Sequence, residues 1–174
     1  MTRISAARNQ LSTAIEMWFL DSDVASTHSL ASSAYQIIHD INDSKNGPSL
    51  LYDSDIVKDG YRKVWINKLK EPYNNLKHAE RNPDPDEEIE IDQKLTEGVI
   101  IFSCIGLRFL GFQHSEIEHT FMAYYTVNHP EIMNDDFDFS DNIPATAIEA
   151  ARSGTKEMFF RALKQLHEQK RCQQ

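Results

Sequence analysis

The sequence predicts an all-α protein, organised as a single domain over residues 1–174 and built as a bundle of five or six helices. Three observations favour this fold. Apolar residues recur at helical spacing in most segments, the chain has only six glycines, and the helix formers alanine, leucine, isoleucine, glutamate and lysine are well represented. A chain of 174 residues is long enough for one domain with its own hydrophobic core.

The first part of the chain predicts two long helices. Residues 5–20 repeat apolar side chains at the spacing of an amphipathic helix. Residues 24–41 combine many alanines and serines with three isoleucines, so we expect a central helix against which neighbouring backbones pack closely. Turn chemistry at residues 46–48, an Asn-Gly-Pro sequence, is expected to follow it.

A third helix is expected next, capped by Asp53 or Ser54 and ending near residue 69. Pro72 follows it. Residues 73–80 are expected to form a short helix or an irregular turn, because the prolines that come directly after this segment cannot continue a helix.

The second half of the chain predicts an extended arm and three helices. Near residues 87–92 isoleucines alternate with acidic residues, which indicates a short, exposed extended arm. Helices are expected over residues 96–112 and 115–127, the second with Ser115 as its N-cap. Residues 145–169 are expected to form a long helix, interrupted at Ser153-Gly154.

Charge and cysteine content narrow the class of protein. The formal net charge of -9 disfavours a DNA-binding protein, since DNA carries a dense negative charge. Cys104 and Cys172 lie far apart and one is in an apolar run, so we expect no disulfide framework and a cytoplasmic location. The longest apolar run, residues 99–112, is shorter than the about 20 residues that span a bilayer, so no membrane association is expected. No cofactor is expected.

Polar groups are concentrated between Pro72 and Pro83. They belong to Tyr73, Asn74, Asn75, Lys77, His78 and Arg81. If this segment is helical, Asn74, Lys77, His78 and Arg81 share one face. Two fixed cations, amide groups and an imidazole that titrates near neutrality are suited to a phosphate-bearing ligand. The alternative is a structural role, with the asparagines as caps, His78 in the core and Arg81 paired with the acids that follow.

Asn75-Leu76-Lys77-His78, preceded by Asn74, resembles the Asn-x-x-Lys-His variant found in the HEPN superfamily of small all-helical proteins. The resemblance implies a metal-independent endoribonuclease or an inactive relative that binds RNA. In that case His78 is the acid/base candidate, Lys77 and Arg81 are phosphate contacts, and Tyr73 and the two asparagines contact the substrate. Whether the protein is an enzyme stays open.

Two other functions remain open from the sequence. The first is a non-enzymatic helical module that binds a protein partner or a second copy of itself as a homodimer. The second is a metal-binding bundle, for which His28 and His39 are the candidate ligands and His78 a candidate third. His28 and His39 lie on one helix about 16 Å apart, too far to hold one metal without residues from other helices.

Overall fold

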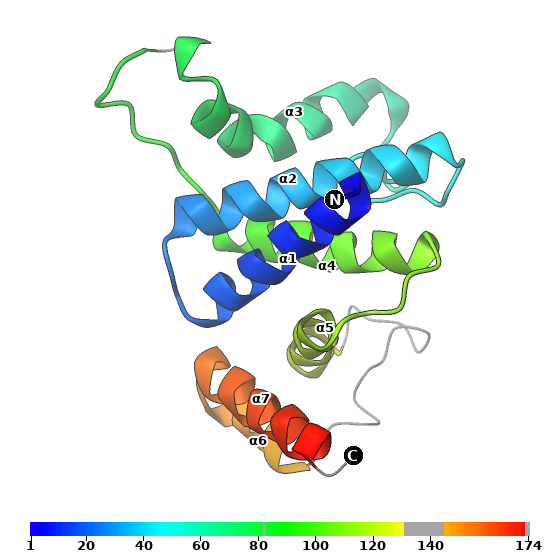
Figure 1. Ribbon diagram of the computed structural model, residues 1–174. Helices are drawn as coiled ribbons and strands as arrows, with labels where there is room; N and C mark the ends of the chain where they lie inside the picture. The colour runs from blue at the N-terminus through cyan, green and yellow to red at the C-terminus, as the bar shows by residue number, and fades with distance from the viewer. Residues whose placement is uncertain (82, 131–144, 173–174) are drawn as a thin grey trace.

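The computed structural model describes residues 1–81, 83–130 and 145–172, and over these residues the chain is all-α, as predicted (Figure 1). It forms α1 (Arg3–Phe19), α2 (Val24–Ser44), α3 (Asp59–Lys77), a 3₁₀ turn η1 (Ala79–Arg81), α4 (Gln93–Phe109), α5 (Glu116–Asn128), α6 (Ala145–Ser153) and α7 (Lys156–Cys172). The described residues contain no strand. Seven α-helices replace the expected five or six.

The predicted interruption at Ser153-Gly154 separates α6 from α7. The Gly154 N–H donates to the Ala150 carbonyl at 2.9 Å, and a Cβ on Gly154 would lie 2.7 Å from that same oxygen. The next helix has its own cap, because the Thr155 hydroxyl accepts the Met158 N–H at 3.2 Å. Two helices, the second with its own N-cap, therefore replace the single long helix.

The helix α2 is central, as its small residues predicted. It contacts α1, α4 and α3, and in Figure 1 α3 lies on the outer side of α2. Close approach of α2 to α4 depends on Gly106, where a Cβ would lie 2.6 Å from Cγ2 of Ile38. Ala31, Ala34 and Ile38 are fully buried on the α2 side of the core.

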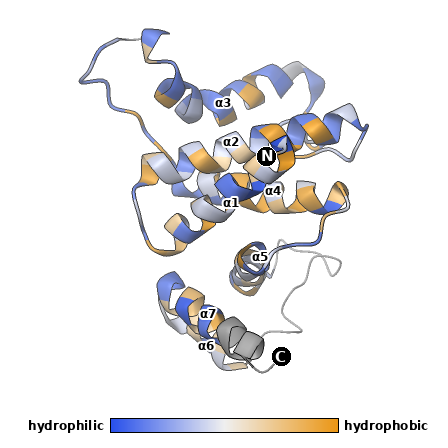
Figure 2. Ribbon diagram, viewed as in Figure 1, coloured by the Kyte–Doolittle hydropathy of each residue, from blue (hydrophilic) through white to orange (hydrophobic). Residues whose placement is uncertain are grey.

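A cluster of aromatic rings joins α1 to α5 and α7. Phe19 is fully buried, and its ring centroid lies 6.1 Å from that of Phe121, 5.6 Å from Tyr124 and 4.9 Å from Phe160. Figure 2 shows the contrast between this interior and α3: α4 is mainly hydrophobic, whereas α3 is mainly hydrophilic.

The third helix differs from the prediction at both ends. It begins at Asp59, after Lys58, and not at the expected cap Asp53 or Ser54. The Asp53 carboxylate caps no helix, because it accepts the Leu50 N–H at 2.8 Å in the preceding loop. At the other end Pro72 lies inside α3, where its missing N–H leaves one helical hydrogen bond unmade. Pro72 is the one buried residue of α3, so its ring packs inward.

The connection from η1 to α4 has no regular structure where it is described. Residues 87–92, the expected arm, contain neither helix nor strand, and Ile89 and Ile91 are half-buried between exposed acids. We expected α4 to begin near Thr96, but it begins three residues earlier, at Gln93. Asp92 is its N-cap and accepts the Lys94 N–H at 2.8 Å. Ser115 caps α5 with a full capping box, as predicted.

Candidate functional site

The polar cluster predicted between Pro72 and Pro83 is divided by the end of α3. The helix ends at Lys77, and His78 is its C-cap with φ -123° and ψ 53°. Arg81 lies in the separate turn η1. The prediction that Asn74, Lys77, His78 and Arg81 share one helix face is therefore wrong; only Asn74 and Lys77 remain on α3.

His78 forms a pair with an acid of its own turn. Its Nδ1 lies 2.9 Å from Oε1 of Glu80, and 29% of the His78 side chain is exposed. A backbone N–H and the imidazole lower the pKa of Glu80, so this carboxylate is ionised near neutral pH and orients the ring. The second ring nitrogen, Nε2, makes no hydrogen bond to any residue of the described chain.

The other predicted site residues lie at the surface with few contacts. Asn75, Lys77 and Arg81 are exposed, whereas Tyr73 and Asn74 are half-buried. The Lys77 Nζ lies 5.6 Å from the centroid of the Tyr73 ring, a distance typical of a cation–π contact. Tyr73 therefore contacts a lysine of its own helix and remains partly open to solvent.

The structure shows a feature that the sequence reasoning missed, which we call the lysine stripe. It consists of Lys63, Asn67, Lys70, Asn74 and Lys77. The three lysines are spaced by seven residues, which at roughly 100° per residue shifts each by only about 20° around the helix axis. The amides lie between them on the same side, and the stripe runs for about 21 Å. The seven-residue spacing of the lysines is visible in the sequence. It places them on one side of a helix only if that helix continues through Pro72, which we did not expect.

The three lysines of the stripe differ in solvent exposure and in the groups that they contact. Lys63 and Lys77 are exposed, and Lys70 is half-buried with its Nζ 4.4 Å from the centroid of the buried Tyr52 ring. That contact orients Lys70 without neutralising its charge. No lysine of the stripe forms an ion pair with a described residue.

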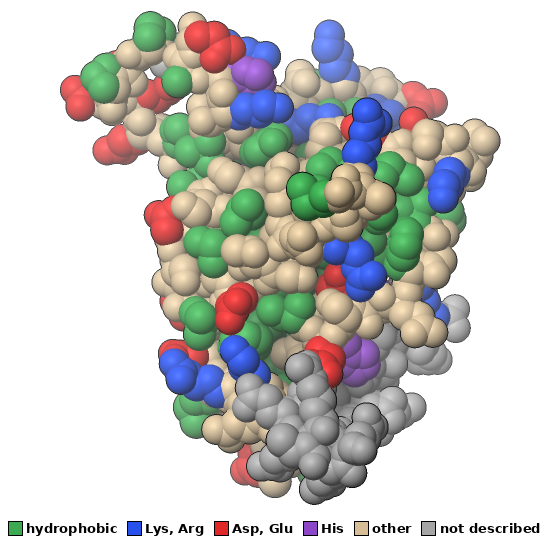
Figure 3. Space-filling view, viewed as in Figure 1, with side chains coloured by type: hydrophobic (Ala, Val, Ile, Leu, Met, Phe, Trp, Pro, Cys, Tyr) green, Lys and Arg blue, Asp and Glu red, His purple; other side chains and the backbone are tan. Residues whose placement is uncertain are grey.

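The charge of α3 and η1 is opposite to that of the rest of the chain. Residues 59–81 carry six lysines and arginines against three aspartates and glutamates, whereas the remainder carries twelve against twenty-four. Figure 3 shows lysine and arginine side chains gathered, with a histidine, over the part of the molecule where α3 lies. This helix is thus a basic surface on an acidic protein.

The histidines proposed as metal ligands are engaged in other contacts. His28 is fully buried, with Nδ1 3.0 Å from the Thr96 hydroxyl and Nε2 3.3 Å from the Ser32 hydroxyl. Burial lowers the pKa of His28 to about 4, so the ring is neutral at pH 7. His39 lies 3.3 Å from the Asp53 carboxylate. The described residues contain no group of three or more histidines, cysteines and acids placed to hold a metal.

Comparisons with protein families, with curated proteins and with solved structures gave no match. Within the described residues, every helix is too short or too polar to cross a lipid bilayer. The function proposed next therefore depends on the residues of this chain alone.

Proposed function

We propose that this protein binds RNA through the lysine stripe of α3. The observation that carries the proposal is the alignment of three lysines along one side of α3, two of them exposed and one half-buried, in a segment whose charge is opposite to that of the rest of the chain. Lysines bind phosphates as point charges and release counterions. The amides of Asn67 and Asn74, placed between the lysines, supply hydrogen bonds to phosphate or sugar oxygens.

RNA is preferred to duplex DNA for two reasons. The acidic remainder of the chain repels a long polyanion, so binding is confined to a short contact along α3. In addition, the resemblance of residues 74–78 to the HEPN superfamily implies an RNA ligand. Short single-stranded segments can follow one basic helix without approaching the acidic faces.

The test compares two variants with the same change in charge. One carries Lys63→Gln, Lys70→Gln and Lys77→Gln; the control carries Lys45→Gln, Lys94→Gln and Arg152→Gln, three exposed cations outside α3. Binding to a labelled single-stranded RNA, and to duplex DNA for comparison, is measured by fluorescence anisotropy over a salt series. Loss of the stripe is expected to weaken RNA binding at least tenfold and to reduce the salt slope by about 2. Equal affinities of the two variants would refute the proposal, and tighter binding of duplex DNA would refute the choice of RNA.

The pair of His78 and Glu80 favours a second function, RNA cleavage. A carboxylate that holds Nδ1 at 2.9 Å leaves Nε2 to move a proton, as an oriented histidine does in general acid–base catalysis. On this proposal Lys77 and Arg81 contact the phosphate and His78 is the catalytic residue. Purified protein is incubated with RNA without added metal, beside His78→Ala and Glu80→Gln. Cleavage that both variants lose supports the function; cleavage that they retain removes His78 from the mechanism.

A further inference from the structure

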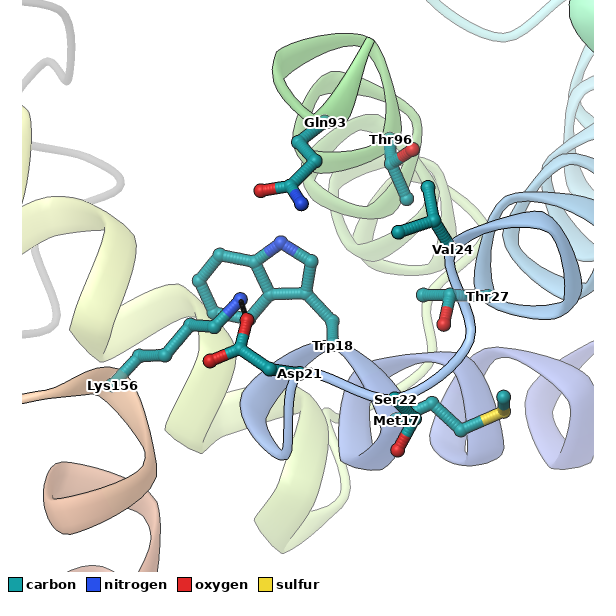
Figure 4. Close-up of a pocket in the computed structure, with 9 residues that line it drawn as sticks. All are labelled: Met17, Trp18, Asp21, Ser22, Val24, Thr27, Gln93, Thr96 and Lys156. Atoms are coloured by element: carbon teal, nitrogen blue, oxygen red, sulfur yellow. Dashed lines mark ion pairs between the residues drawn. The ribbon is translucent and has the colours of Figure 1, made fainter. Parts of the chain in front are cut away.

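A small pocket lies far from the lysine stripe, where the starts of α2, α4 and α7 meet the end of α1 (Figure 4). Its empty volume is about 270 Å³, part of which opens to solvent. Val24, Gln93 and Lys156, which line it, are the first residues of their three helices. This volume includes open solvent and lies just below the roughly 300–1,000 Å³ of small-molecule sites, so only a short ligand fits.

The indole N–H of Trp18 is a buried donor without an acceptor at this pocket. Trp18 is 7% exposed, and its Nε1 makes no hydrogen bond. Its ring is held in place by edge contacts to Phe19 and Phe121, with centroids 5.0 and 5.1 Å away. The other tryptophan differs, because Trp65 Nε1 donates to the Leu51 carbonyl at 2.9 Å. A buried N–H without a partner costs free energy that a bound oxygen atom recovers.

Gln93 presents a second donor to the same space. Figure 4 shows its side-chain amide turned toward the Trp18 indole. No hydrogen bond joins this amide to the indole N–H. Gln93 is exposed at the mouth of the pocket, so it can also move to admit a ligand.

The charges around the pocket largely offset one another, so the uncompensated donor is the main polar feature. The Lys156 ammonium lies 4.3 Å from the centroid of the Trp18 ring and 2.6 Å from the Asp21 carboxylate, so these two charges offset each other. The starts of three helices add their positive dipole ends. The cap carboxylates Asp23 and Asp92 each accept one backbone N–H, of α2 and α4 respectively, and offset these dipole ends.

We propose that this pocket binds a small molecule with a carbonyl oxygen, as a carboxylate or an amide, on a short apolar body. The oxygen accepts hydrogen bonds from Trp18 Nε1 and the Gln93 amide. The apolar body lies against Val24, the Thr96 methyl group and the indole ring. This site is independent of RNA binding, since it shares no residue with the lysine stripe.

The two tryptophans make the proposal testable by NMR, because Trp65 serves as an internal reference. Uniformly ¹⁵N-labelled protein is titrated separately with butyrate, butyramide and butylamine. We expect a saturable downfield shift of the Trp18 indole ¹H with butyrate, butyramide or both, with a Kd of about 1 mM or tighter, and no shift of Trp65. Butylamine has the same body without a carbonyl oxygen and is expected to leave Trp18 unchanged. Absence of any saturable shift, or an equal shift with butylamine, would overturn the proposal and leave water as the occupant.

A matched pair of glutamine variants tests the second donor. Gln93→Leu removes the amide at the mouth of the pocket, and Gln36→Leu makes the same change at a half-buried position of α2, away from the pocket. Gln93→Leu is expected to weaken binding of the carbonyl compound at least threefold, whereas Gln36→Leu leaves the Kd unchanged. Equal Kd values for the wild type and Gln93→Leu would overturn the two-donor site. Gln93 is exposed and Gln36 is half-buried, so neither variant removes a core side chain or is expected to lose the fold.

Discussion

The helices α2 and α3 have similar lengths, 21 and 19 residues, yet they relate to the core in opposite ways. Eight residues of α2 are buried, including Tyr35 and Ile38, whereas Pro72 alone is buried in α3. The residues of α2 are therefore constrained by neighbours on several sides. The exposed positions of α3 lack such constraints, so packing leaves the choice of residue there open.

Polar contacts join α3 to the loop before it, while Ile66 and Leu69 pack against the core. Trp65 Nε1 donates to the Leu51 carbonyl at 2.9 Å, and Arg62 Nη1 donates to the Asp53 carbonyl at 2.9 Å. The Lys70 ammonium lies over Tyr52. A helix with few buried apolar contacts opens at a lower free energy than the core helices. The comparison thus predicts a rigid interior and a more readily detached basic helix.

The largest expected effect comes from the aromatic core. Phe19→Ala removes a fully buried ring from the cluster that joins α1, α5 and α7, and it should lower the free energy of unfolding by about 3–5 kcal/mol. Val64→Ala on α3, where the side chain is 59% exposed, should change it by less than about 0.5 kcal/mol. Urea denaturation of both variants measures the difference. Similar losses in the two would mean that α3 belongs to the core.

The next effect concerns the buried ion pair between α1 and α5. Arg8 donates to both oxygens of Glu118, at 3.0 and 2.8 Å, and the Glu118 side chain is fully buried. Glu118→Gln should cost about 3 kcal/mol, because it leaves the arginine without its counter-charge. The control Glu157→Gln breaks an exposed pair with Arg161 and should cost about 0.5 kcal/mol or less. Chemical denaturation at pH 7 checks both values, and equal costs would contradict the role assigned to burial.

His28 should make the core sensitive to acid. Its pKa is lowered from 6.5 to about 4 in the folded protein by burial. Between these pH values the unfolded chain binds a proton that the folded chain does not, so stability falls as pH falls through this window. At pH 5 the loss from this group is about 2 kcal/mol relative to pH 7. His28→Gln, which keeps hydrogen-bonding groups beside Thr96, should lose that part of the pH dependence. Parallel stability curves for the two proteins would show that His28 does not titrate in this way.

The smallest effect should appear in α3 alone. Trp65→Phe keeps a ring but removes the hydrogen bond to the Leu51 carbonyl, a loss of about 1 kcal/mol. Amide hydrogen exchange should quicken by about fivefold along α3, while α2 and α4 are unchanged. Uniform faster exchange in all helices would instead indicate that α3 unfolds only with the rest of the protein.

Local signals in the chain were enough for several parts of this structure. The Ser115 cap, the small-residue helix α2 and the interruption at Ser153-Gly154 all follow from residues within a few positions of each other. The end of α3 could not be predicted in this way. Pro72 is a helix breaker by local rules, but here its ring packs inward and α3 continues to Lys77.

The sequence by itself determined the helical class, the Ser115 cap and the seven-residue spacing of the lysines, because these depend on interactions along one helix. Only the tertiary structure decided which face of α3 is exposed, that His28 is closed in by Thr96 from 68 residues away, and that Trp18 and Gln93 meet at one pocket. Such contacts depend on how the helices pack against one another. They join residues that are far apart in the sequence, and no repeating pattern along the chain predicts them.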